Sequence, residues 1–235
     1  MARNLILTGG LYHPFEAASE TLRQALAAVG FSSDISTDIH TGLTWLDDGD
    51  YDLVTMYCLR FPMLAERFVN DRALWAVTLG KADTRRIETH LQGGGGILAL
   101  HTAAISFDDW PRWREIVGAG WTWGTSYHPP YGPVSVQMTS AQHPITQGLP
   151  AFTFDEEAYS KLDLVPGIEP LATVRASVQD AASPCLWARD VGQGRVVYDA
   201  LGHDSASIDQ PTHQRILQRA ALWATRGSEA DMARC

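Results

Sequence analysis

The chain alternates short apolar runs with segments of helical periodicity, and this alternation limits its fold more than any other feature. In the first half, the predicted strands are residues 4–8, 31–39, 51–57 and 97–100, and the predicted helices are residues 15–29 and 84–91. Two successive strands that are joined by a helix must lie parallel, because the crossover returns the chain to the same end of the sheet. The pattern therefore predicts an α/β fold with a mainly parallel central sheet.

The second half continues this pattern less regularly. Its predicted strands are residues 134–138, 171–174, 185–188 and 195–198, followed by a helix at 212–225. Residues 190–194, with Gly192 and Gly194, predict a hairpin turn between the last two strands. The residues after Gly227 are small and polar, which predicts a frayed end. We expect one domain over residues 1–227 and a frayed tail over 228–235.

Charge and hydropathy argue against nucleic acids and membranes as partners of this chain. The 235 residues carry a net charge of −9, whereas nucleic-acid binding requires clustered Lys and Arg, so we expect no nucleic-acid partner. No apolar run approaches the roughly 20 residues that cross a bilayer, so we expect no membrane association and a cytoplasmic location. The three cysteines have no CxxC spacing, which predicts neither a disulfide framework nor a thiolate zinc site.

Several polar residues fall directly after predicted strands, where open parallel sheets bind their ligands. They are His13 after the first strand, Cys58 after the third, His101 after the fourth and His203-Asp204 after the last. His101 has the sharpest context, because a glycine run, an apolar strand and small residues surround it. This is the setting in which α/β enzymes place a nucleophile or an anion site at the start of a helix.

Several motifs along the chain occur together in one known family. They are Gly93-Gly94-Gly95-Gly96-Ile97-Leu98-Ala99-Leu100-His101, Tyr127-His128, His143-Pro144-Ile145, Glu156-Glu157-Ala158-Tyr159, Trp187 with Gly192-Gln193-Gly194-Arg195-Val196, and Leu201-Gly202-His203-Asp204. In this order the sequence resembles the ThuA-like (trehalose utilisation) family over roughly residues 4–226. The resemblance implies a class I glutamine amidotransferase-like, flavodoxin-like three-layer sandwich, and a role in catabolism of trehalose or a related disaccharide or keto-sugar.

The resemblance also implies which chemistry is lost. Amidotransferases of this fold hold a cysteine on the turn after the glycine-rich strand, because glutamine hydrolysis needs a thiolate there. This chain has His101 at that position, so we expect that it is not a glutaminase. Cys58 ends a strand but lacks a glycine elbow, which predicts a small buried side chain.

The resemblance and the strand ends together predict the site residues. We expect His101, Glu157 and His203 to be catalytic, and Glu157 is favoured over Glu156 because adjacent residues of an extended segment face opposite ways. The expected substrate-binding residues are His13, His128, Tyr159, Trp123 and Asp204.

Two chemistries remain open for these residues. Imidazoles and a carboxylate either transfer protons beside a sugar carbonyl or hold a divalent metal such as zinc, with His101, His203 and Glu157 as its ligands. The aromatic residues Trp110, Trp121, Trp123, Tyr127 and Tyr159 can stack on a sugar, with at most two of the tryptophans near it. The alternative to an enzyme is a non-catalytic member of the fold that binds a sugar or a partner protein. A homodimer is also compatible with the aromatic loops.

Overall fold

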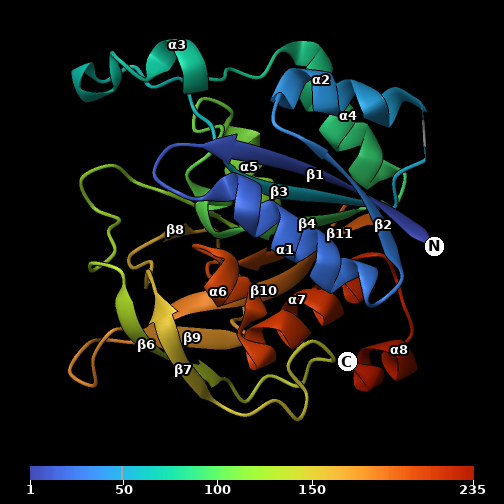
Figure 1. The fold of residues 1–235 in the computed structure, drawn as a ribbon, viewed down its shortest axis with the longest axis vertical. Helices are drawn as coiled ribbons and strands as arrows, with labels where there is room; N and C mark the ends of the chain where they lie inside the picture. Colours follow the sequence, from blue (N-terminus) through green and yellow to red (C-terminus); the bar gives the residue numbers. More distant parts are fainter. Residues whose placement is uncertain (49) are drawn as a thin grey trace.

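The computed structural model describes residues 1–48 and 50–235, and its main feature is a nine-stranded twisted sheet (Figure 1). In spatial order its strands are β2 (Phe31–Ser36), β1 (Ala2–Gly10), β3 (Leu53–Leu59), β4 (Gly96–Leu100), β11 (Gly194–Asp199), β10 (Ser183–Val191), β9 (Ala172–Arg175), β6 (Gly132–Met138) and β7 (Phe152–Glu156). A separate small pair joins β5 (Ala119–Gly120) to β8 (Asp163–Leu164).

The sheet has a parallel and an antiparallel part. Strands β2, β1, β3, β4 and β11 run parallel, and β10, β9, β6 and β7 extend the sheet in antiparallel order. The predicted α/β fold with a mainly parallel sheet is confirmed, and residues 190–194 do form part of the hairpin between β10 and β11. Strand β7, which leads directly to Glu157, was not predicted from the sequence.

Helices cover both faces of the sheet. Helices α1 (Phe15–Ala27), α6 (Ser205–Asp209) and α7 (Pro211–Ala224) pack together on one face, in front in Figure 1. Helices α4 (Lys81–Gln92) and α5 (Pro111–Val117) lie on the other face, with α2 (Ile39–Thr44) beside α4. Short turns of helix complete the chain: η1 (Trp45–Asp48), η2 (Glu66–Phe68), α3 (Arg72–Trp75) and η3 (His101–Ala104).

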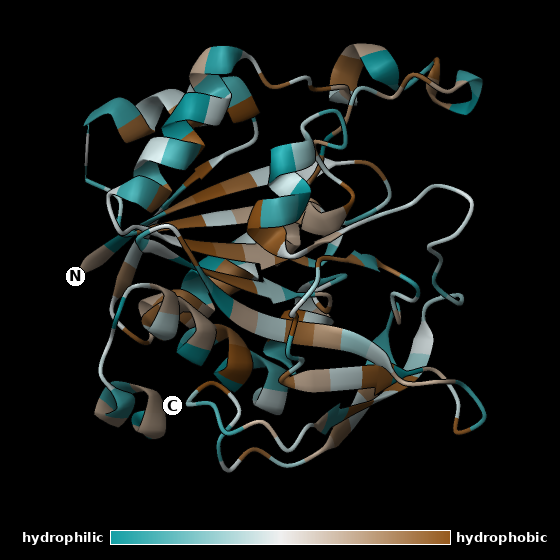
Figure 2. Ribbon diagram, turned by 180° about the vertical axis from the view of Figure 1, so that it is seen from behind, coloured by the Kyte–Doolittle hydropathy of each residue, from teal (hydrophilic) through white to brown (hydrophobic). Residues whose placement is uncertain are grey.

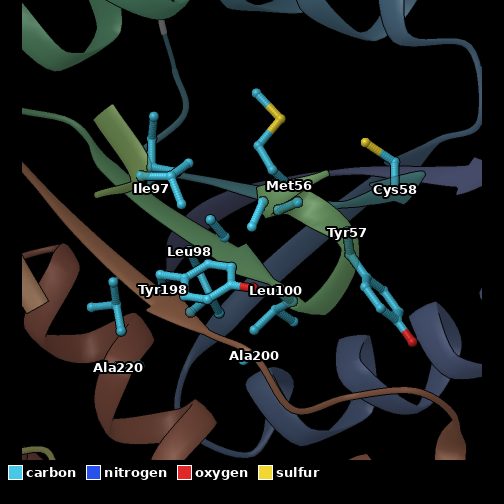
Figure 3. Close-up of a cluster of buried hydrophobic side chains, with 14 of the residues drawn as sticks. Met56, Tyr57, Cys58, Ile97, Leu98, Leu100, Tyr198, Ala200 and Ala220 are labelled. Atoms are coloured by element: carbon cyan, nitrogen blue, oxygen red, sulfur yellow. The ribbon is translucent and has the colours of Figure 1, made fainter. Parts of the chain in front are cut away.

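The central strands are apolar on both sides because helices cover both faces. Figure 2 shows this as brown strands between helices that are teal on their outer sides. In Figure 3, Met56 and Cys58 point to one side of β3 and Tyr57 points to the other. Residues 97–100 of β4 are buried throughout, and Ala220 of α7 packs in the same cluster. Helix α7 therefore covers β4 and β11.

The C-terminal residues form helix α8 (Glu229–Arg234), where the sequence analysis expected a frayed tail. Ser228 caps the helix, since its hydroxyl accepts the N–H of Asp231 and the Asp231 carboxylate accepts the N–H of Ser228. Met232 is buried and anchors the helix. A capping box and one apolar contact thus order a segment whose composition alone suggested fraying. Within the described residues, the structure has no helix of the length and apolarity that a bilayer span requires.

Candidate functional site

Four side chains from four different strand ends meet at the carboxyl edge of the parallel strands. His13 follows β1, His101 follows β4, His203 follows β11, and Glu157 follows β7. Each of them offers one nitrogen or oxygen atom to a group in which all four atoms lie within 4.8 Å of one another. The ring centroids of His101 and His203 are 5.7 Å apart. The structure thus brings together the three residues predicted to be catalytic and adds His13 to them. We call these four residues the His/Glu cluster.

His101 occupies a sharp turn at the end of β4. Its φ of 47° lies in the left-handed region, and His101 opens the four-residue 3-10 turn η3, where the start of a helix was expected. The ring is fully buried, and its Nδ1–H donates to the carbonyl oxygen of Ala200 at 2.7 Å. Tyr198 donates its hydroxyl to the His101 carbonyl at 2.9 Å. Strand β11 therefore fixes both the backbone and the ring of His101.

His13 lies in the loop after β1, and Gly10 at the end of β1 allows that loop to pass close to β3. Gly10 has a φ of 146°, and a Cβ atom there would lie 2.4 Å from the carbonyl oxygen of Leu59. Only glycine allows the chain to pass so close to β3 and turn. The Nδ1–H of His13 donates to the carbonyl oxygen of Leu11 at 2.9 Å, which directs Nε2 toward the cluster. The Nε2 atoms of His13 and His101 are 3.1 Å apart.

Glu156 and Glu157 face opposite ways, as the sequence analysis expected, and Glu157 enters the cluster. Glu157 Oε2 lies 3.3 Å from His101 Nε2, 3.6 Å from His13 Nε2 and 3.4 Å from His203 Nδ1. The carboxylate thus has three imidazoles around one oxygen.

Glu156 is buried behind the cluster, and its carboxylate accepts hydrogen bonds from the backbone segments that carry the cluster residues Glu157 and His203. Its Oε1 accepts the N–H of Glu157 at 2.7 Å, and its Oε2 accepts the N–H groups of Gly202 at 2.7 Å and His203 at 3.2 Å. The Ser207 hydroxyl donates to the same Oε2 at 2.5 Å. One buried carboxylate therefore ties β7 to the segment that follows β11. The sequence analysis gave Glu156 no role.

A second buried pair lies beyond Ser207. His213 and Asp199 are both fully buried, with His213 Nε2 3.2 Å from Asp199 Oδ2, while His213 Nδ1–H donates to the Ser207 carbonyl at 2.7 Å. Ser207, His213 and Asp199 resemble the residue types of a hydrolase triad. All three are fully buried, so substrate has no access to them and they support the fold.

Charge in the His/Glu cluster is divided unequally. Burial alone would raise the pKa of Glu157, but the imidazoles of His101, His13 and His203 lower it far below its ordinary value. Burial lowers the pKa of His13, whereas for His203 the nearby Glu157 outweighs burial and raises the pKa. The His203 side chain is 17% exposed and that of His13 only 6%, so His203 retains more solvation and carries the proton more easily.

A cavity of about 450 Å³ opens above the cluster. The residues that line it are Tyr12, His13, Leu59, Phe61, Arg67, Phe68, Ile105, Trp121, Trp123, His128, Glu157 and Tyr159. Three of the predicted substrate-binding residues besides His13 are among them: His128, Tyr159 and Trp123. The tryptophans that line the cavity are Trp121 and Trp123.

Arg67 and Phe68 escaped the sequence analysis, because residues 60–80 show no periodicity that would assign them. They follow the predicted strand at 51–57, and this position could have indicated that they lie at the ligand-binding edge of the sheet. The guanidinium of Arg67 lies 4.8 Å from the ring centroid of Trp123 and 4.6 Å from that of Phe68. A cation and aromatic faces therefore form one wall of the cavity.

Other predicted residues lie elsewhere. Asp204 was expected to bind substrate, but it is not among the lining residues: its carboxylate caps α6 by accepting the N–H of Ser207 at 2.9 Å, and it accepts the Tyr131 hydroxyl at 3.1 Å. Trp110 is also outside the lining and stacks near Trp113, with ring centroids 6.3 Å apart. Asp204 follows β11 in sequence, but a helix start requires a cap at that point.

The cysteines and a second, larger cavity do not contribute to the cluster. Cys58 is fully buried, and this burial raises the pKa of its thiol to about 11. A cavity of about 520 Å³ lies at the opposite edge of the parallel strands and is lined by Arg85, Arg86 and residues 93–95, among others. In the part of the chain that the structure describes, the metal-ligating side chains gather only beside the smaller cavity.

Solved structures share this fold. A ThuA-like protein from Parabacteroides merdae is 20% identical, with a TM-score of 0.75 over 95% of this chain and 90% of its own. A ThuA-like protein from Bacteroides uniformis is 18% identical, with a TM-score of 0.64 over 97% and 94%. A cytoplasmic protein from Salmonella typhimurium is 16% identical, with a TM-score of 0.58 over 96% and 97%. These likenesses establish the fold.

The family is established by sequence. No curated protein matches the chain. The family model ThuA, described as trehalose utilisation, matches residues 3–224, which include all four cluster residues and helix α7. Because this match spans nearly the entire chain, the protein belongs to the ThuA family, which connects it in general terms with trehalose utilisation.

Proposed function

We propose that the protein acts on trehalose, or on a related disaccharide or keto-sugar, in the cavity above the His/Glu cluster. The observation that carries this proposal is the Glu157 carboxylate, which borders an aromatic cavity and lies within 3.3–3.6 Å of four imidazoles, those of His13, His101, His128 and His203. Sugar rings stack their C–H faces on Trp121 and Trp123, while their hydroxyl groups take polar partners such as His128. The volume of about 450 Å³ suits a small molecule of this class.

The chemistry that the cavity supports best is proton transfer beside a carbonyl. The hydrogen on a carbon next to a ketone is acidic, so a keto-sugar reacts once a base accepts that proton and a polar group stabilises the oxygen. The cluster supplies polar groups for the oxygen, and His128 lines the same cavity with an exposed ring that can accept a proton. The buried Tyr159 hydroxyl lies 3.2 Å from His101 Nε2 and can donate one. Glutamine hydrolysis is disfavoured, because the elbow holds His101 and the Cys58 thiol is buried.

Cytoplasmic action fits this proposal. The structural relative from Salmonella typhimurium is described as a cytoplasmic protein. We propose the same compartment for this chain.

The test is turnover of trehalose and of its 3-keto derivative, followed by NMR in deuterated water. We expect the keto-sugar to be converted or to take up deuterium beside its carbonyl, and His128→Ala, which removes the proposed base, to slow this by at least about 100-fold. His40→Ala is the matched control, because His40 is a half-exposed imidazole 2.8 Å from the carboxylate of Asp83, outside the cavity. Keto-sugar binding with neither turnover nor deuterium uptake would favour the non-catalytic alternative.

A further inference from the structure

The arrangement of the cluster's nitrogen atoms is incomplete without a cation. Carbonyl oxygens only accept hydrogen bonds, so the Nδ1 atoms of His13 and His101, which lie 2.9 Å and 2.7 Å from backbone carbonyls, carry protons. In the neutral rings, the Nε2 atoms then hold lone pairs, and these two atoms are 3.1 Å apart. Two lone pairs at this distance repel each other. A positive ion placed between them turns the repulsion into coordination.

Two further buried atoms lack hydrogen-bond partners. They are Glu157 Oε2 and His203 Nδ1, which lie 3.4 Å apart without hydrogen-bonding geometry. A buried polar atom that has no partner costs about 1–3 kcal/mol, so such atoms point to a missing ligand. Both belong to the same group of four atoms as the Nε2 atoms of His13 and His101. The unsatisfied atoms and the facing lone pairs therefore converge on one point.

The distances between the four atoms match a metal site. A tetrahedral zinc ion with bonds of about 2.0–2.2 Å keeps its ligand atoms about 3.3–3.6 Å apart. Four of the six separations in the cluster are 3.1, 3.3, 3.4 and 3.6 Å, and all six are within 4.8 Å. The hydrogen bonds from His13 and His101 to carbonyl oxygens are the support that metal-bound imidazoles receive in proteins, because they fix the tautomer and the ring.

From this geometry we propose that His13, His101, His203 and Glu157 form a binding site for one divalent transition-metal ion. Three imidazoles and one carboxylate favour zinc, and also suit iron, cobalt and nickel, whereas calcium and magnesium prefer sites made of oxygen atoms. Glu157 and His13 line the cavity, so the ion faces the space where a small molecule binds. Bound there, the ion supplies a Lewis acid, and proton transfer falls to His128 and Tyr159. The site stands independently of the proposed sugar chemistry.

The test is metal analysis of the full chain purified without an affinity tag. We expect about one transition-metal ion per chain, and, after chelation, tight rebinding of zinc or cobalt with a tetrahedral cobalt spectrum. Calcium and magnesium should not compete. A chain that contains no metal and binds none of zinc, iron, cobalt or nickel overturns the proposal.

Variants locate the ion. His203→Ala and His13→Ala should weaken zinc binding by at least about 100-fold, more than the loss of an outer hydrogen bond does. His40→Ala removes an imidazole outside both the cavity and the cluster and should bind zinc as the parent does. Circular dichroism of the metal-free proteins checks folding, and His203→Gln replaces any variant that fails it. Equal zinc affinity in a folded cluster variant and the parent overturns the assignment. Sugar turnover is scored separately, so metal binding without turnover refutes only the proposed function.

Discussion

Glu156→Gln tests whether the buried carboxylate behind the cluster holds the site together. The change keeps the shape of the side chain but converts one acceptor oxygen into an N–H₂ donor. The amide oxygen keeps the most hydrogen bonds if it takes the place of Oε2, which accepts from Gly202, His203 and Ser207. The amide nitrogen then faces the N–H of Glu157, which Glu156 Oε1 accepts at 2.7 Å in the parent. Two donors therefore meet in a site that is 1% exposed.

The expected loss follows from the contacts. A hydrogen bond to a charged group contributes about 1.5–3 kcal/mol, and a buried donor left unpaired costs about 1–3 kcal/mol. Because these effects overlap, we expect the free energy of unfolding to fall by about 2–4 kcal/mol. The remaining bonds to Gly202 and Ser207 weaken as well, since their acceptor loses its charge.

Urea unfolding followed by tryptophan fluorescence measures this change. We expect the midpoint for Glu156→Gln to drop by about 1 M, with the slope unchanged. Glu169→Gln is the matched control, because Glu169 is exposed, and its midpoint should stay with the parent. Equal midpoints for Glu156→Gln and the parent would refute the reasoning that this carboxylate ties β7 to the segment after β11.

Three further predictions concern the turns and the buried pair. His101→Gly should have a free energy of unfolding about 1–2 kcal/mol higher than that of His101→Ala, because both variants lose the ring but only alanine keeps a Cβ at a φ of 47°. Equal urea midpoints for the two variants would contradict backbone strain at this turn. Gly10→Ala should lower the free energy of unfolding by about 3 kcal/mol, since its Cβ would lie 2.4 Å from a carbonyl oxygen, and an unchanged urea midpoint would speak against this close approach. Burial lowers the pKa of His213, but Asp199, a hydrogen bond to the backbone and Glu156 outweigh it, so the pKa is raised in the folded state. Its stabilisation is then complete below the unfolded pKa of about 6.5 and is lost as pH rises through the folded pKa. His213→Gln should remove this part of the pH dependence when urea unfolding is compared between acidic and alkaline buffers, and identical pH profiles would contradict it.

Much of the architecture could be predicted from local pattern. The alternation of strands and helices implies a parallel sheet, because a helical crossover returns the chain to the same edge. The same rule placed His101 and His203 at one edge, since each follows a strand. Strand β7 (Phe152–Glu156) was missed because it is short and belongs to the antiparallel part of the sheet. Whether such a segment forms a strand depends on its packing against neighbouring strands more than on its own sequence.

The sequence by itself determined the fold class, the family resemblance and the edge at which polar residues gather, because periodicity and strand ends are local properties. Only the tertiary structure decided that Asp204 stays outside the cavity as a helix cap, and that His13 Nε2 lies 3.1 Å from Nε2 of a histidine 88 residues away. Such distances depend on how four strand ends and their loops pack against one another. Chain spacing carries no record of that packing, since the hydrogen bond that orients the His101 ring comes from the carbonyl of Ala200, on a distant segment of the chain.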